Sequence, residues 1–342
     1  MGIKKHLVIL CMLIAVALLL GACGDQAAPA APGEPQVETI TLRFAVTLPE
    51  ADPQYQHILM MVNEILERTE GLVFEMFPNG ELGSLADTIE MIQQGAPIIT
   101  VASADFLASY VPDLGAMNGP YLYYCWSEIA LLTRSDWFNN LTTQLSEEFR
   151  IKTLALNWFS GDRHMLTTNR PIHTVEDLRG LLMRVPGGIT YIEMFNALGA
   201  SPVTLAWSDV YSGLQQGIVD GAEAGLATLY ASSLYEVGRY IALTSHVSLV
   251  NGIYMNTDVF NSLPVAYQRI IVETAEKFGT IFGEFCVENE AYFRQRLEDR
   301  GIIFTEINIA EFAERARAAY DAVPGFSPGI FDTIRNEIEN QR

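Results

Sequence analysis

Residues 41–48 read TLRFAVTL, an apolar run that predicts a buried strand. Two similar runs follow at residues 72–78, LVFEMFP, and 98–103, IITVAS. A helical pattern separates each pair of strands: one helix begins after Asp52-Pro53, where aspartate caps and proline fits the first turn, and another covers residues 85–94. This alternation of strand and helix predicts a parallel sheet with helices on its faces.

The same alternation resumes after a predicted helix at residues 127–149, which indicates a second α/β lobe. The chain is 49 % hydrophobic, and the body that remains after the N-terminal segment has about 300 residues. A body of this length and composition is large enough for two domains. Residues 264–300 depart from the alternation and form one long helical pattern, which at 1.5 Å per residue would span ~50 Å and brace both lobes. The strands predicted after that helix are residues 151–159, 165–169, 181–186 and 202–207.

The N-terminus has the pattern of an export signal. Lys4 and Lys5 precede an apolar stretch, residues 7–20, that is shorter than the ~20 residues a membrane span needs. Leu20-Gly21-Ala22-Cys23 resembles the bacterial lipobox, in which the cysteine is acylated; the alternative is an ordinary cleaved signal with a coincidental cysteine. We therefore predict a lipoprotein signal peptide at 1–22, a lipidated Ala/Pro-rich tether at 23–38, and attachment to the outer face of the cytoplasmic membrane.

Composition limits the classes of partner. The net charge is −20, and loss of Lys4 and Lys5 with the leader makes it more negative. Such a surface repels phosphate backbones and anionic lipid headgroups, which argues against nucleic acid or a membrane surface as the partner. Cys125 and Cys286 lie far apart in the sequence and are interpreted as buried apolar residues rather than as a disulfide.

Enzymes are the main competing class. The chain has no dinucleotide-binding glycine pattern and no phosphate loop. Its mature histidines are scattered without the spacing of metal ligands, so we predict no catalytic residue, no metal site and no cofactor. These histidines are His57, His164, His173 and His246.

Two arginines lie at the ends of predicted strands, at the sheet edge where open α/β folds bind ligands. Arg184 precedes a Pro-Gly-Gly turn, and Arg163 lies in the loop SGDRHM. A guanidinium can hold a carboxylate through two parallel hydrogen bonds. Each arginine could instead form an ion pair within the protein. The partner of Arg163 would be the adjacent Asp162, and the partner of Arg184 would be Asp177 or Glu193.

A series of motifs resembles the solute-binding subunit of the TRAP (tripartite ATP-independent periplasmic) transporters, the DctP-type family. The resemblance covers roughly residues 40–330 in unbroken order. The motifs are Phe77-Pro78-Asn79-Gly80-Glu81-Leu82-Gly83, Val111-Pro112-Asp113-Leu114, Arg184-Val185-Pro186, residues 197–203 (ALGASPV), Trp207-Ser208-Asp209-Val210-Tyr211, Leu214-Gln215-Gln216-Gly217, Val219-Asp220-Gly221, Leu234-Tyr235-Glu236-Val237 and Thr244-Ser245-His246.

The resemblance implies an α/β clamp of the periplasmic-binding-protein type that captures an organic acid and passes it to the small and large TRAP membrane subunits. The predicted clamp is a monomer and not an enzyme. By the same resemblance, Arg184 makes the main salt bridge to the ligand carboxylate and Arg163 is a second binding arginine. Lobe I is expected to comprise residues 39–160 and about 249–288, and lobe II residues 161–248 and about 289–342.

Other predicted ligand-binding residues carry open alternatives. Ala224 stands where many family members have a ligand-binding asparagine, so a different acid is expected from the sialic acid or C4-dicarboxylate cases. Glu223 either lines the pocket or holds local structure. Trp207 is either a pocket wall or a core residue. Thr47 and Ser103 end strands of lobe I and either bond the ligand or cap the following helix.

The predicted mechanism is closure of the clamp around a carboxylate that bridges the lobes. It requires that Arg163 and Arg184 face one gap and that neighbouring acids do not neutralise them. An alternative keeps the clamp but assigns it to a sensor kinase or an ATP-driven importer. Genes for TRAP membrane subunits beside this one would favour the transporter.

Overall fold

The computed structural model describes residues 39–342. The predicted signal peptide at 1–22, the acylated Cys23 and the tether at 23–38 lie outside the described residues. Within residues 39–342, no helix combines the length and apolar character that crossing a membrane requires.

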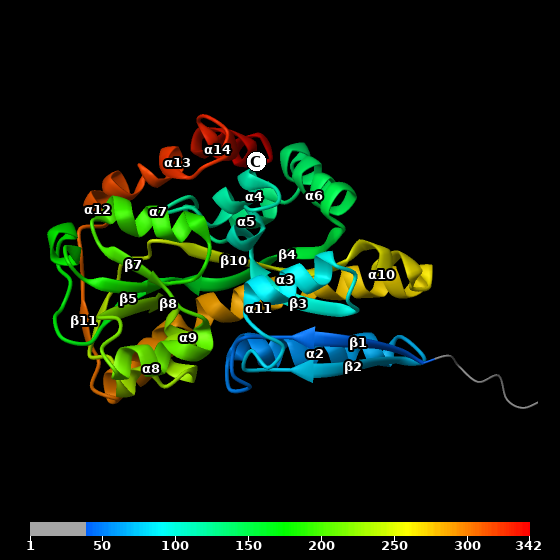
Figure 1. Ribbon diagram of the computed structural model, residues 1–342, viewed down its shortest axis with the longest axis horizontal. Helices are drawn as coiled ribbons and strands as arrows, with labels where there is room; N and C mark the ends of the chain where they lie inside the picture. Colours follow the sequence, from blue (N-terminus) through cyan, green and yellow to red (C-terminus); the bar gives the residue numbers. More distant parts are fainter. Residues whose placement is uncertain (1–38) are drawn as a thin grey trace, which may run out of the picture. The chain divides into compact units, whose positions relative to one another are not determined.

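The first lobe is built on a five-stranded sheet in the order β2-β1-β3-β10-β4 (Figure 1). Its strands β1 (Ile40–Ala45), β2 (Leu72–Phe77) and β3 (Ile98–Ser103) run parallel, as the alternation predicts. β10 (Ser248–Asn256) runs antiparallel to both β3 and β4 (Ile151–Asp162), so one strand of this sheet is reversed. No strand was predicted at β10, because Asn251-Gly252 interrupts its apolar pattern.

Helices cover both faces of this sheet. On one face α2 (Pro53–Glu67) packs with the first half of α11 (Val265–Asp299) in a core that includes Ile58, Ile271 and Phe278. α2 begins as predicted, because the Asp52 side chain accepts a hydrogen bond from the backbone N–H of Gln54 at 2.8 Å and Pro53 occupies the first turn. The other face carries α3 (Leu85–Gln93), α4 (Pro112–Gly115), α5 (Ser127–Leu132) and α6 (Asp136–Phe149).

The predicted helix at 127–149 is divided into α5 and α6. Ser135 ends the continuity: its side chain accepts a hydrogen bond from the N–H of Phe138 at 3.1 Å and thereby caps α6. A hydroxyl that bonds a backbone N–H three residues later starts a new helix instead of continuing the old one.

The second lobe is built on a six-stranded sheet in the order β11-β9-β5-β8-β6-β7. β5 runs antiparallel to both β8 and β9, whereas the other pairs are parallel. Each sheet therefore contains one reversed strand, which agrees with the predicted mostly parallel sheets. The strands are β5 (His164–Thr167), β6 (Leu182–Val185), β7 (Ser201–Thr204), β8 (Gly221–Ala224), β9 (Tyr240–Ala242) and β11 (Ile303–Thr305).

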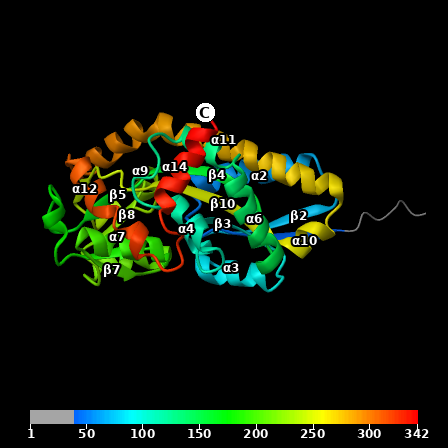
Figure 2. The ribbon, with the colours of Figure 1, turned by 90° about the horizontal axis from the view of Figure 1, so that it is seen from above.

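The faces of the second sheet are also covered by helices. α7 (Ile189–Leu198), α12 (Ile309–Ala316) and α13 (Ala319–Ala322) share one core. The opposite core holds α8 (Val210–Gln215) and α9 (Leu226–Ala231), together with Phe293 and Leu297 from the end of α11. The long helix thus contributes to the cores of both lobes, as predicted, and Figure 2 shows it running past both sheets.

The last helix, α14 (Ile330–Asn340), returns to the first lobe. Its Ile330, Ile334 and Ile338 are buried in the same core as Leu114 and Ile129. The predicted lobe II included all of residues 289–342, whereas these contacts join α14 to lobe I.

The two cysteines of the body are free and do not form a disulfide. The interpretation of both as buried apolar residues was wrong for Cys125, which is exposed, while Cys286 is half-buried beside α2 and the aromatic residues of α11.

Candidate ligand-binding site

A cavity of about 90 Å³ lies where the lobes face each other, and it adjoins a hollow of about 350 Å³ with which it shares several walls. Their combined size suits a small organic molecule. Lobe I contributes Thr47, Gln54, Ser103 and Asn251, and lobe II contributes Arg163, Arg184, Trp207 and Thr228. The shared walls are Thr47, Leu85, Phe106, Arg184, Pro186 and Trp207.

Arg184 reaches this cavity from β6 and is 4 % exposed. Its Nε and Nη2 donate to the carbonyl oxygen of Leu205 at 3.0 and 2.8 Å, which fixes the plane of the guanidinium. The Trp207 ring lies against it, with the guanidinium carbon 5.1 Å from the ring centroid. Within residues 39–342 its nearest carboxylate oxygen is Glu223 Oε1, 4.0 Å from Nη1 and beyond hydrogen-bond distance.

Burial lowers the pKa of Arg184 to about 10, an effect that the neighbouring Arg163 charge increases and Glu223 partly offsets. The guanidinium is therefore charged at neutral pH. A buried cation that lacks a hydrogen-bonded anion favours an anionic ligand beside it.

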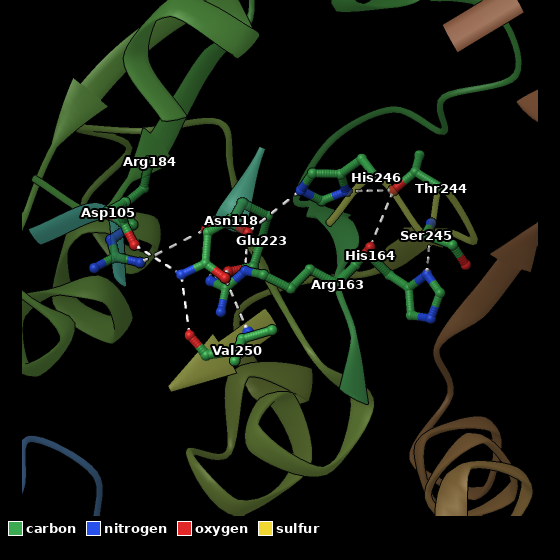
Figure 3. Close-up of polar contacts among 10 residues, drawn as sticks. All are labelled: Asp105, Asn118, Arg163, His164, Arg184, Glu223, Thr244, Ser245, His246 and Val250. Atoms are coloured by element: carbon green, nitrogen blue, oxygen red, sulfur yellow. Dashed lines mark hydrogen bonds and ion pairs between the residues drawn. The ribbon is translucent and has the colours of Figure 1, made fainter. Parts of the chain in front are cut away.

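Arg163 follows β4 and shares the cavity with Arg184, but Glu223 neutralises it. Its Nη2 donates to Glu223 Oε1 at 2.6 Å and to the Glu223 carbonyl at 2.7 Å, and its Nε donates to Oε2 (Figure 3). Glu223, on β8, has no exposed surface. Burial alone would raise the pKa of Glu223, but Arg163 holds it well below its ordinary value, so the pair is ionised.

In the described structure Glu223 holds Arg163 and does not line the cavity, which favours the local structural role over the pocket-lining one. The predicted mechanism requires that both arginines face one gap and that no neighbouring acid neutralise either of them, and the second requirement is not met. Both arginines face one gap, as required, but a neighbouring acid does neutralise Arg163. That acid is Glu223, not the adjacent Asp162, which accepts a hydrogen bond from Ser248 at 2.6 Å. Arg163, Arg184 and Glu223 together leave a single net positive charge.

His246 is buried beside Glu223, the carboxylate that pairs with Arg163. Its Nε2 lies 3.4 Å from Glu223 Oε2, and its Nδ1 lies 2.8 Å from the Thr244 hydroxyl. Burial lowers the pKa of His246 more than Glu223 raises it, which favours the neutral ring. Nothing in the sequence separates His246 from the other histidines, apart from its place in the Thr244-Ser245-His246 motif.

Trp207, Ser103 and Thr47 all line the cavity. Trp207 donates from its indole N–H to the Ser232 hydroxyl at 3.2 Å, which holds the ring in the wall. Ser103 makes no side-chain cap to the short helix η1 (Ala104–Leu107), and Asp52, not Thr47, caps α2. The capping alternatives for these two residues were therefore wrong. Ala224 is buried in the lobe II core and does not line the cavity.

Sequence reasoning missed four polar residues of the cavity wall. Gln54 comes from the first turn of α2, Ser160 from β4, Thr228 from α9 and Asn251 from β10. Asn251 donates to Ser160 Oγ at 2.8 Å and to Gln54 Oε1 at 3.3 Å. The one clue in the sequence was the position of Asn251 within the largely apolar run SLVNGIYM, residues 248–255.

A family model described as bacterial extracellular solute-binding protein, family 7 (DctP), matches residues 44–324. A solute-binding protein of Sulfitobacter sp. is 29 % identical over 82 % of this chain and 83 % of its own length. Among solved structures, a TRAP periplasmic solute-binding protein of Fusobacterium with bound sn-glycerol-3-phosphate is 29 % identical, with a TM-score of 0.84 over 88 % of this chain and 98 % of that one. Another, from Actinobacillus succinogenes with bound L-galactonate, is 27 % identical, with a TM-score of 0.84 over 88 % and 100 %.

Proposed function

Since this chain belongs to family 7 of the bacterial extracellular solute-binding proteins, we propose that it captures a small organic acid between its lobes and delivers it to a TRAP membrane permease. Members of this family bind solutes for transport and are not enzymes. The bound L-galactonate of the Actinobacillus protein supports a carboxylate as the ligand.

The proposal rests on the burial and the hydrogen-bond partners of Arg184. Its guanidinium is buried in the cavity, oriented by the Leu205 carbonyl, and without a carboxylate at hydrogen-bond distance among residues 39–342. A ligand carboxylate at Nη1 would supply the missing anion. Arg163 contributes a neutralised guanidinium that shapes the wall, so one ligand carboxylate balances the remaining charge.

Closure of the lobes accompanies binding. The walls come from both lobes, and a hydrogen bond of 3.3 Å from the Thr190 hydroxyl to the Gly115 carbonyl joins α7 to α4. A ligand that contacts both lobes favours the closed form, because only that form supplies all of its contacts. No bond of the ligand is broken.

The remaining parts of the proposal concern attachment and assembly. We propose that Cys23 is acylated, that residues 23–38 tether a monomeric clamp to the outer face of the cytoplasmic membrane, and that the small and large TRAP subunits receive the ligand. Lobe I comprises residues 39–160 and about 249–288 together with α14, and lobe II comprises residues 161–248 and about 289–329. Trp207, Ser103 and Thr47 join the two arginines as the residues around the ligand, whereas Glu223 acts by holding Arg163 and Ala224 stays in the lobe II core.

A thermal-shift screen of 2-oxo, hydroxy, dicarboxylic and sugar acids tests this function. A ligand that binds only the folded protein raises the unfolding midpoint by mass action. We expect a carboxylic acid to do so and the matching primary amide to have no effect. Equal shifts with acid and amide, or no shift with any acid, would contradict the proposal.

A further inference from the structure

We propose that Gln54 is a specificity-determining residue whose side-chain amide N–H donates to an uncharged oxygen of the ligand, remote from its carboxylate. The inference rests on the proposed function and deepens it: the preferred ligand is a hydroxy or oxo monocarboxylate, not a simple fatty acid of the same length.

The Gln54 amide is buried without a full set of partners. The side chain is only 3 % exposed and lines the same cavity as Arg163 and Arg184. Its Nε2 is buried and has no hydrogen-bond acceptor among residues 39–342. Because a buried donor is costly to leave unpaired, a donor at a cavity wall indicates that the cavity's occupant supplies the acceptor.

The surrounding contacts fix where this amide lies. The backbone N–H of Gln54 is held by the Asp52 carboxylate at 2.8 Å, which anchors the first turn of α2. Its side-chain Oε1 accepts from Asn251 Nδ2 at 3.3 Å, and Asn251 is held in turn by Ser160. Because Gln54 Oε1 already accepts from Asn251, the two Nε2 hydrogens of Gln54 are free to donate to another partner.

The chemistry of the neighbouring wall defines the class of acceptor. Asn251, Ser160 and Thr228 line the cavity beside Gln54, and all are uncharged. The positive charge of the cavity resides on Arg184, since Glu223 neutralises Arg163. A hydroxyl or keto oxygen suits this wall, whereas a second carboxylate would meet no second unpaired cation there.

The test uses isothermal titration calorimetry on the protein from residue 24 onward, with the tightest acid of the screen and the saturated acid of equal chain length; for a hexonate such as L-galactonate the partner is hexanoate. We expect the saturated acid to bind at least about tenfold more weakly. Gln54→Leu should weaken binding of the oxygenated acid by about tenfold and leave the saturated acid unchanged, so that the preference disappears.

Gln56→Leu is the matched control, because Gln56 lies on the same helix but is exposed and donates to the Glu50 carbonyl at 2.6 Å. Gln54→Glu, which keeps the size but replaces the donor by an acceptor, should weaken the oxygenated acid at least as much as Gln54→Leu. Thermal unfolding without ligand reports whether each variant folds, and Gln54→Leu is expected to be at least as stable as the unmodified chain.

The possible outcomes separate the two proposals. Failure of every acid to bind would overturn the proposed function. Binding of an acid with equal affinity by the unmodified protein and Gln54→Leu, or a saturated acid as the tightest ligand, would overturn the role of Gln54 and leave the proposed function standing.

Discussion

Gly188 of lobe II lies directly against the Asp105 carboxylate of lobe I, so closely that a methyl group on Gly188 would overlap Asp105 Oδ2. Gly188 precedes α7, and Asp105 lies in η1, next to the cavity-lining residue Phe106. Asp105 is held by Asn118, whose Nδ2 donates to it at 3.3 Å (Figure 3). The close approach of the two lobes at this point therefore depends on the absence of a side chain.

Gly188→Ala is expected to weaken ligand binding by at least about tenfold, because the added methyl opposes closure of the lobes over the cavity. Gly188 has an ordinary backbone conformation, so the effect arises from the contact and not from backbone strain. Titration calorimetry measures the affinity, and small-angle scattering measures whether ligand still compacts the variant.

Gly187→Ala provides the control for this experiment. A methyl group there would meet Phe106 at 3.6 Å and Thr204 at 3.7 Å, which are ordinary contact distances. We expect near-normal affinity in that variant. Equal affinities of the two variants would show that the Gly188 contact does not govern closure.

Arg184→Ala is expected to lower the affinity for a carboxylate by about 3 to 5 kcal/mol, the usual loss when one partner of a buried ion pair is removed. Calorimetry against the best acid of the screen measures the loss. Arg179→Ala, an exposed arginine of the same lobe, is the control and should retain full affinity. Unchanged binding by Arg184→Ala would refute the assignment of this residue.

Arg163→Met is expected to destabilise the fold by about 3 to 5 kcal/mol, because it leaves the Glu223 carboxylate buried without its partner. The double variant Arg163→Met/Glu223→Leu removes both charges and should recover most of this loss. Urea denaturation of the two variants supplies the comparison. A double variant no more stable than Arg163→Met would mean that the pair's charge balance does not account for the effect.

Asp52→Asn should stabilise the protein more at pH 7.5 than at pH 4.5, by about 2 kcal/mol. Burial raises the pKa of Asp52 from 3.8 to about 6. The folded state therefore holds this proton more tightly than the unfolded chain, so the contribution to stability is greatest below pH 3.8 and declines as the pH rises through 6. Asparagine keeps the helix cap without the charge.

Urea titrations at both pH values measure the difference between the unmodified chain and Asp52→Asn. Asp258→Asn is a suitable control, since Asp258 is a largely exposed carboxylate in the first turn of α10 (Thr257–Ser262). A stability change from Asp52→Asn that is the same at both pH values would contradict the assigned pKa.

Much of the fold follows from patterns within a few residues. Apolar runs predicted β1, β2 and β3, and Asp52-Pro53 located the start of α2, because strand periodicity and helix capping act between near neighbours in sequence. The two arginines were found for the same reason: Arg184 lies near the end of a recognisable strand, and Arg163 follows one. The break at Ser135 was missed because a serine inside a helical pattern is compatible with either continuation or a new cap.

The sequence by itself determined the alternation of strand and helix from β1 to β3, the long helix α11 and the presence of two arginines at strand ends. Only the tertiary structure decided what those arginines do. Glu223 is sixty residues from Arg163 in sequence, yet β5 and β8 pair and bring the two into contact. Arg184 is left without a hydrogen-bonded acid among residues 39–342. Gln54 and Asn251 likewise meet only through folding. Local spacing cannot encode such contacts, because they depend on which strands pair and how the lobes close.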